Sequence, residues 1–200
     1  MSKVTAQLVR ELREATGAPM MDCKKALDET SGDIKEAIDA LRKRGISKAA
    51  KKAGREMGEG RVGSYIHFNG KVGSMVELCC ETDFCSGNED FQKALSDICM
   101  HVAANDPVPL AVSVDDLPPE DLAKEMSIYE GQAKESGKPE QFWPKIVEGR
   151  MKKWKKEHAL LEQPFMGDGD QTVGAVVTEL VAKLGENITI ARFSRFRIGD

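Results

Sequence analysis

The sequence predicts an α+β fold, in which a small domain of three helices precedes a core of small antiparallel sheet covered by helices. Three observations lead to this prediction. Residues 1–45 show the apolar spacing of short helices, and residues 61–80 alternate like a β-hairpin. Helical spacing then returns, until a last apolar strand near the C-terminus. No repeat of fixed period is visible.

Length and composition describe an ordinary globular chain. The 200 residues are 40% hydrophobic and 31% charged, with a formal net charge of -4. This composition excludes a disordered chain and an overall basic field for nucleic acid. No stretch approaches the roughly 18 apolar residues of a membrane span, and the start lacks the apolar core of a signal peptide. The odd count of five cysteines favours reduced thiols. We therefore expect a soluble cytoplasmic protein.

The first 45 residues are predicted to form three short helices. Thr5 is a candidate N-cap for the first helix, which stops around Gly17. The second starts near Met20. The third starts at Asp33, with an acidic residue three positions later, which is the spacing of a capping box. Gly45 is expected to end the third helix.

A basic helical connector is expected next. Seven Lys and Arg residues occur here without an acid: Arg42, Lys43, Arg44, Lys48, Lys51, Lys52 and Arg55. Three glycines between residues 54 and 60 then loosen the chain, so we place a domain boundary there. The predicted domains are a helical domain at 1–45, the connector at 46–60 and a core domain at 61–200.

The clearest β signal lies at residues 61–80. Apolar residues alternate with others from Val62 to Phe68. Asn69-Gly70 follows, a dipeptide typical of a turn in which both residues have positive φ. The return strand leads into Thr82-Asp83-Phe84, and it places on one face Val72, Ser74, Val76 and Leu78.

Helical segments follow the hairpin. Asn88 is a candidate N-cap for an amphipathic helix, and a proline-rich connector covers residues 105–119. Two further helices are expected at about 119–136 and 140–158. Thr172 caps an apolar helix that stops at Gly185. The last strand carries Ile188, Ile190, Phe196 and Ile198.

The sequence offers little for an active site. No metal or nucleophile motif includes any of the histidines, which are His67, His101 and His158. The sequence also contains neither of the glycine-rich motifs Gly-x-x-x-x-Gly-Lys-Ser/Thr and Gly-x-Gly-x-x-Gly that bind nucleotides. Cys79, Cys80 and Cys85 lack C-x-x-C spacing, and neighbouring strand residues point to opposite faces. This pattern favours packing over metal binding or thiol catalysis. We expect no catalytic residue, no metal, no cofactor and no direct nucleotide binding.

Two features are less easily explained by packing alone. Met20 and Met21 stand together at a helix start, where one can enter the small core while the other stays outside as an adaptable partner contact. Thr82-Asp83-Phe84 ends a strand with a carboxylate and a large ring. The residues alone leave two interpretations open: Phe84 turns inward as a core plug, or it stands outward as a wedge.

Two long motifs run from Leu12 to Leu27 and from Glu77 to Phe84. The first reads Leu-Arg-Glu-Ala-Thr-Gly-Ala-Pro-Met-Met-Asp-Cys-Lys-Lys-Ala-Leu, and the second reads Glu-Leu-Cys-Cys-Glu-Thr-Asp-Phe. Shorter motifs are Ala49–Gly54, Glu148–Lys153 and Leu161–Phe165. Together they resemble the bacterial elongation factor Ts family over essentially the whole chain. Because the hairpin segment occurs once, the chain is similar to the short members with a single core repeat.

The resemblance implies a ubiquitin-associated-like helical domain and a guanine nucleotide exchange factor of translation elongation, which is not an enzyme. It implies binding to elongation factor Tu with GDP, disturbance of the magnesium and phosphate site, GDP release, and retention until GTP binds. A homodimer is implied through the core domain. Partner docking would use Arg13, Met20 and Met21, and magnesium dislocation would use Thr82, Asp83, Phe84 and Cys85. From Cys85 the sequence departs from the usual family pattern.

Two rival functions follow from the residues. A metal- or thiol-dependent enzyme would use Cys79, Cys80, Cys85 and His101. An RNA-binding accessory protein would use residues 42–55, although no aromatic residue is present there for base stacking. A solvated helix face, or a match to an acidic protein partner, is favoured for that segment. We therefore expect no specific binding to nucleic acid and none to membranes.

Overall fold

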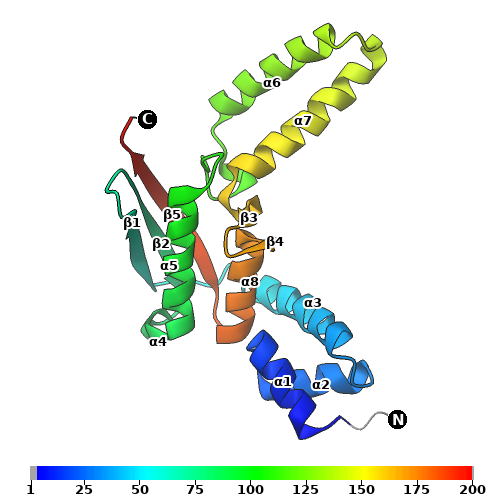
Figure 1. The fold of residues 1–200 in the computed structure, drawn as a ribbon, viewed down its shortest axis with the longest axis vertical. Helices are drawn as coiled ribbons and strands as arrows, with labels where there is room; N and C mark the ends of the chain where they lie inside the picture. Colours follow the sequence, from blue (N-terminus) through cyan, green and yellow to red (C-terminus); the bar gives the residue numbers. More distant parts are fainter. Residues whose placement is uncertain (1–3, 200) are drawn as a thin grey trace. The chain divides into compact units, whose positions relative to one another are not determined.

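The computed structural model describes residues 4–199 and has an α+β fold (Figure 1). The helices are α1 (Ala6–Thr16), α2 (Met20–Glu29), α3 (Ile34–Lys52), α4 (Asp83–Gly87), α5 (Glu89–Ala104), α6 (Pro119–Glu135), α7 (Trp143–His158) and α8 (Val173–Leu184), with short 3-10 turns η1 (Val114–Asp116), η2 (Glu140–Phe142) and η3 (Leu160–Glu162). The strands are β1 (Glu59–Ile66), β2 (Val72–Cys80), β3 (Pro164–Phe165), β4 (Asp168–Thr172) and β5 (Ile188–Arg197). One sheet has the order β1-β2-β5, and β3 pairs with β4 in a second. The predicted helices and strands are thus confirmed in kind and order, whereas α4, β3 and β4 were not predicted.

The chain forms two compact units that are not contiguous in sequence. The first consists of Met1–Gly60, Cys79–Gln92 and Val177–Thr189, and the second of Arg61–Leu78, Lys93–Val176 and Ile190–Asp200. The division passes through several elements, including β2, α5 and α8. The division into domains at 1–45, 46–60 and 61–200 stays a prediction.

The three N-terminal helices enclose a small core of their own. Its buried members are Val9, Leu12, Cys23, Ala26, Leu27 and Ala37. The Thr5 hydroxyl accepts a hydrogen bond from the Leu8 amide at 3.2 Å, and Asp33 accepts one from the Glu36 amide at 2.9 Å. Gly17 ends α1 with φ of 64°. Both predicted N-caps and the first predicted stop are therefore confirmed.

The predicted stop of the third helix is wrong. Helix α3 does not end at Gly45 but continues to Lys52, so residues 46–52 of the predicted connector belong to α3. A Cβ atom at Gly45 would lie only 3.2 Å from the Cβ of Ala182. Gly45 therefore serves the close approach of α3 and α8, which a local sequence pattern does not reveal.

The turn between β1 and β2 also differs from the prediction. The His67 amide donates to the Val72 carbonyl at 2.9 Å, which leaves a four-residue loop instead of two residues. Gly70 has φ of 66°, but Asn69 is not among the described residues with positive φ. The Asn69 side chain instead accepts a hydrogen bond from the Lys71 amide at 2.9 Å, and this local bond favours the longer loop.

Helix α5 packs closely on the β1–β2 hairpin. The predicted inner residues Ser74, Val76 and Leu78 are buried, and the Ser74 hydroxyl donates to the Cys99 carbonyl at 2.6 Å. A Cβ at Gly63 would lie 2.6 Å from Cγ of Leu95, so α5 approaches where β1 has no side chain.

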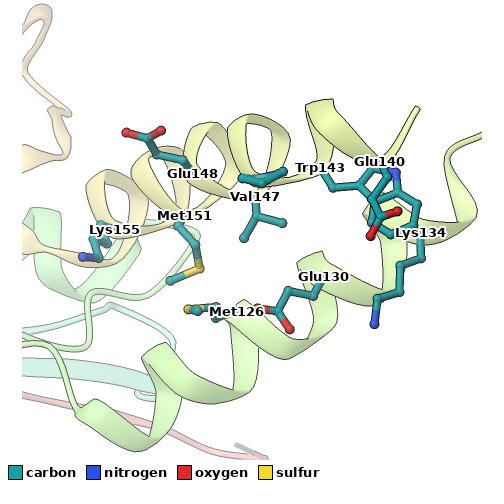
Figure 2. Close-up of a pocket in the computed structure, with 10 residues that line it drawn as sticks. Met126, Glu130, Lys134, Glu140, Trp143, Val147, Glu148, Met151 and Lys155 are labelled. Atoms are coloured by element: carbon teal, nitrogen blue, oxygen red, sulfur yellow. The ribbon is translucent and has the colours of Figure 1, made fainter. Parts of the chain in front are cut away.

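Helices α6 and α7 pair as an antiparallel hairpin (Figure 1). Trp154 is buried with Ala111 and Leu117. A groove of about 580 Å³ lies between the two helices (Figure 2). It is lined by Met126, Glu130, Lys134, Glu140, Trp143, Pro144, Val147, Glu148, Met151 and Lys155.

Helix α8 begins and ends where the sequence predicts. The Thr172 hydroxyl accepts a hydrogen bond from the Ala175 amide at 3.1 Å, and Gly185 follows the helix with φ of 81°. Among residues 4–199, no helix combines the length and the apolar character that crossing a bilayer requires.

Candidate functional site

The Thr82-Asp83-Phe84 segment forms an exposed helical turn. The sequence places it in a loop after the hairpin, whereas the structure starts helix α4 at Asp83. Thr82 is the N-cap, and its hydroxyl accepts a hydrogen bond from the Cys85 amide at 3.3 Å. Asp83 is exposed in the first turn, where a carboxylate suits the helix dipole. The Phe84 side chain is 87% exposed, so it is not a core plug.

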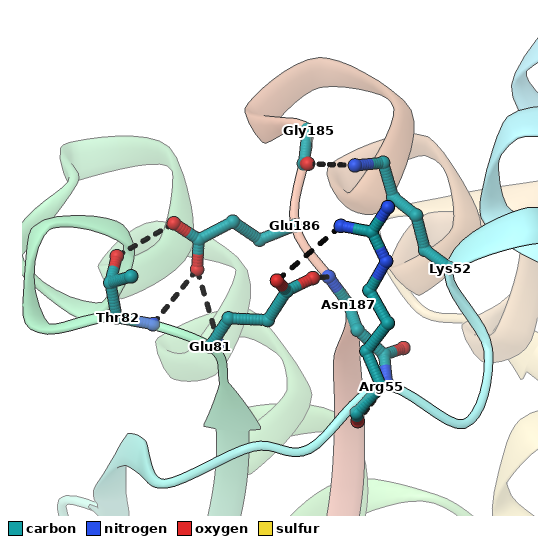
Figure 3. Close-up of polar contacts among 7 residues, drawn as sticks. All are labelled: Lys52, Arg55, Glu81, Thr82, Gly185, Glu186 and Asn187. Atoms are coloured by element: carbon teal, nitrogen blue, oxygen red, sulfur yellow. Dashed lines mark hydrogen bonds and ion pairs between the residues drawn. The ribbon is translucent and has the colours of Figure 1, made fainter.

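Glu186 holds the backbone in front of this turn. One of its carboxylate oxygens accepts hydrogen bonds from the Glu81 amide at 3.1 Å and the Thr82 amide at 3.0 Å. The other accepts from the Thr82 hydroxyl at 2.6 Å (Figure 3). Hydrogen bonds to a charged acceptor are stronger than neutral ones. The backbone at Glu81 and Thr82, which precedes the exposed Phe84, is therefore held in place.

Glu81 completes a reciprocal set of contacts with the same connection. Its carboxylate accepts a hydrogen bond from the Asn187 amide at 2.6 Å and lies 3.5 Å from the Arg55 guanidinium (Figure 3). The Asn187 amide, together with Arg55, lowers the pKa of Glu81 below its ordinary value. The Asn187 side chain also donates to the Arg55 carbonyl at 3.1 Å, and Lys52 bonds to the Gly185 carbonyl. Three distant segments are thereby joined.

Two cysteines flank the turn and are buried beneath it. Cys80 is fully buried and Cys85 is 6% exposed. The Cys80 thiol donates to the Thr82 carbonyl at 3.1 Å. Burial raises the pKa of Cys80, and burial, Cys80 and Glu186 raise the pKa of Cys85 to about 12. The sequence groups Cys85 with the exposed wedge residues, but its side chain supports the turn from inside.

The predicted docking residues Arg13, Met20 and Met21 lie at the surface. Met20 is 49% and Met21 is 72% exposed, and Arg13 is exposed on α1. The prediction that one methionine enters the core is wrong. Cys23, Ala26 and Leu27 supply the buried face of α2, so no methionine is needed there.

Four of the seven basic residues from Arg42 to Arg55 have partners within the chain. Arg44 pairs with Glu29, and Lys48 lies 2.6 Å from Asp22. Lys52 and Arg55 make the contacts with Gly185 and Glu81 already described. These contacts give the basic segment a structural use and favour a helix face over a nucleic-acid patch.

Of the four residues in the rival enzyme hypothesis, Cys80 and Cys85 come together, but Cys79 and His101 do not join them. Within residues 4–199, the potential metal ligands that the fold gathers are Cys80, Cys85 and Glu186, without Cys79 or His101. His101 is buried with Nε2 at 3.0 Å from Oε1 of Gln163. Sequence reasoning missed Glu186 because it lies 104 residues from Thr82 and follows an ordinary helix stop.

Comparison with known proteins shows the family. Residues 2–200 match the family model described as Elongation factor TS. The chain is 52% identical over 197 residues to Elongation factor Ts of Thermosipho melanesiensis, which covers 98% of this chain and 100% of the relative. It is 51% identical to that of Geotalea uraniireducens, over 98% and 90% of the two chains. It is 50% identical to that of Nitratidesulfovibrio vulgaris, over 98% and 97%. The chain belongs to the elongation factor Ts family.

Proposed function

We propose that this chain is a guanine nucleotide exchange factor of translation elongation. It binds elongation factor Tu with GDP, disturbs the magnesium and phosphate site, promotes GDP release and remains bound until GTP binds. Family membership supports elongation factor Tu as the partner. The exposed Phe84, on the turn that Glu186 holds, carries the mechanism. No covalent bond changes in nucleotide exchange, so the chain needs no catalytic acid, base or nucleophile.

The wedge is Phe84, supported by strand β2 behind it. A buried phenylalanine removes ~150–250 Å² from water. Fully burying such a side chain contributes about 1.5–3 kcal/mol. The binding accelerates release only where it is stronger in the nucleotide-free partner. The coupling is reciprocal, so returning nucleotide expels the factor.

Asp83 acts beside the ring on the partner's phosphate and magnesium region. Mg²⁺ requires nearly ideal octahedral geometry, so a small displacement of a supporting helix weakens its site. The exposed Asp83 carboxylate competes for hydrogen-bond donors that otherwise face the nucleotide. Thr82, which precedes Asp83, is held by its bond to Glu186, and Cys85 supports the same turn from its buried side.

Docking on the nucleotide-binding domain of the partner uses the N-terminal helices, which we interpret as a ubiquitin-associated-like domain. Exposed Met20 and Met21 provide adaptable apolar contacts, and Arg13 provides a charge on the neighbouring helix. Changes at Arg13 or Met20 are expected to weaken the complex without altering the chemistry of release.

The core domain is proposed to pair two copies of the chain. Large exposed apolar side chains lie on the three-stranded sheet, on its hairpin loop and directly after β5: Val62, Ile66, Phe68, Met75, Phe196 and Ile198. Exposed apolar patches of this kind mark interaction surfaces. A second copy would cover them, and the dimer would present two wedges to two GTPases. Cytoplasmic location follows from this role in translation.

Release of labelled GDP from elongation factor Tu tests the function. In the presence of excess unlabelled GDP, a small fraction of this chain relative to the partner is expected to accelerate release, since each copy acts repeatedly. A nucleotide-free complex is expected to survive gel filtration and to dissociate when GTP is added. An unchanged release rate at saturating amounts of this chain contradicts the proposal.

A further inference from the structure

Three side chains beneath the exposed turn converge as a set of metal ligands. The sulfur atoms of Cys80 and Cys85 and a carboxylate oxygen of Glu186 all lie within 4.8 Å of one another. Both cysteines are buried, and Glu186 is half-buried. All three belong to the first compact unit. They come from the end of β2, from α4 and from the connection between α8 and β5.

The spacing is close to that of a tetrahedral zinc site. Zinc binds thiolate at ~2.3 Å and carboxylate at ~2.0–2.2 Å. At a tetrahedral angle these bonds separate two sulfurs by about 3.8 Å and sulfur from oxygen by about 3.6 Å. Small side-chain movements therefore bring ligands within 4.8 Å onto one ion.

We propose that Cys80, Cys85 and Glu186 bind one Zn²⁺ ion, with water in the fourth position. The two thiol protons leave as the dication enters, so the net charge of the cluster is the same before and after binding. An ion of that charge therefore adds no uncompensated charge to a buried site.

The ligand chemistry selects the class of metal. Two thiolates with one carboxylate suit a borderline cation such as zinc. Mg²⁺ and Ca²⁺ require six or more oxygen ligands, which this set does not supply. The sequence favoured a packing role for the cysteines because the third ligand, Glu186, follows Cys85 only after 101 positions.

The Glu186 carboxylate already accepts hydrogen bonds on both of its oxygens. Its Oε2 accepts hydrogen bonds from the amides of Glu81 and Thr82, while Oε1 accepts one from the Thr82 hydroxyl (Figure 3). The Glu186 side chain also makes a hydrogen bond with Cys85. An ion on Oε1 leaves both amide bonds in place. It would cross-link both ends of Thr82-Asp83-Phe84 to the same carboxylate and stiffen the turn. The ion-binding claim does not depend on the proposed exchange activity.

Metal titration of the full-length chain, without added histidines, tests the site. The probes are Zn²⁺ alone and Co²⁺ alone, in a phosphine reductant that keeps the thiols reduced. We expect one ion per chain, a rise in Tm with zinc, and near-ultraviolet thiolate-to-cobalt absorption. A wild-type chain without that absorption overturns the proposal, whatever the variants do.

The variants locate the site. Cys85→Val and Glu186→Gln should each abolish the zinc-dependent rise in Tm, and Cys85→Val should also abolish the cobalt absorption. Cys79→Ser is the matched control, because Cys79 lies next to Cys80 in the strand and points to the opposite face. It should retain both signals. Retention of both signals by folded Cys85→Val, with folding checked by circular dichroism, contradicts the assignment.

Discussion

At the residue scale, the role of Phe84 depends on a side chain far away in the sequence. An aromatic ring at the end of an alternating strand can point inward or outward, and the sequence alone left both orientations open. The structure shows Phe84 exposed, on a turn that Glu186 holds through Glu81 and Thr82. The Thr-Asp-Phe segment could thus be found from the sequence, but its anchor could not.

His101 is the residue for which the structure gives a pH dependence. The Gln163 side-chain amide donates to two carbonyls, of Pro107 and Glu157, so its oxygen accepts from Nε2–H of His101. Nδ1 of His101 is the buried side-chain nitrogen or oxygen without a partner among the described residues. Burial lowers the pKa of His101 below 6.5, and the bond to Gln163 opposes this shift only in part.

The lowered pKa predicts a loss of stability on acidification. Below about pH 6.5, His101 binds a proton in the unfolded chain but stays neutral in the folded chain. The contribution of neutral His101 to the free energy of unfolding is complete above its pKa in the unfolded chain. It is lost as the pH falls toward its pKa in the folded chain. Denaturant unfolding at about pH 7.5 and about pH 5.5 should show a larger decrease for the wild type than for His101→Gln. Equal decreases would contradict this account.

At the scale of elements, periodicity and caps were reliable where the causes are local. Thr5, Asp33 and Thr172 begin their helices as predicted, because a capping hydrogen bond lies within a few residues. The predicted helix stop at Gly45 is wrong because this glycine is required by a contact with Ala182, 137 positions away. Asn69 was misread because its side chain bonds to Lys71 and favours a longer loop.

The packing role of Gly45 gives a prediction for helix α3. Gly45→Val adds atoms where even a Cβ is 3.2 Å from Ala182, so we expect a loss of about 1–3 kcal/mol in the free energy of unfolding. Gly131→Val in helix α6 is the matched control, since nothing lies within 4 Å of a Cβ at Gly131. The control should be neutral or slightly stabilising, because valine favours helix more than glycine does. Equal effects at both sites would refute the packing role.

At the scale of the whole molecule, each compact unit is assembled from three separate segments. Changes in composition along the sequence can predict only contiguous domains, because they do not show which distant segments lie together in space. Strand pairing and the contacts of Glu81 and Glu186 join segments about a hundred residues apart. The class of fold could therefore be predicted, but the composition of the units could not.

The proposed pairing of two copies is also tested at this scale. The wild type should sediment as a dimer, and Ile66→Lys should sediment as a monomer, because it places a charge on the exposed sheet. Ile46→Lys is the control: this residue is also exposed, at 56%, but lies on helix α3. It should leave the dimer intact. A monomeric wild type at micromolar concentration would exclude pairing.

The most direct test of the central claim is GDP release with Phe84→Ala. Removing the ring takes away the apolar area that displaces the partner's site, so the accelerated release should fall by about 100-fold at saturating factor. Phe142→Ala removes another exposed ring, 47% exposed in the turn before α7, and should release GDP like the wild type. Circular dichroism should show both variants folded. Full stimulation of GDP release by folded Phe84→Ala would contradict the wedge mechanism.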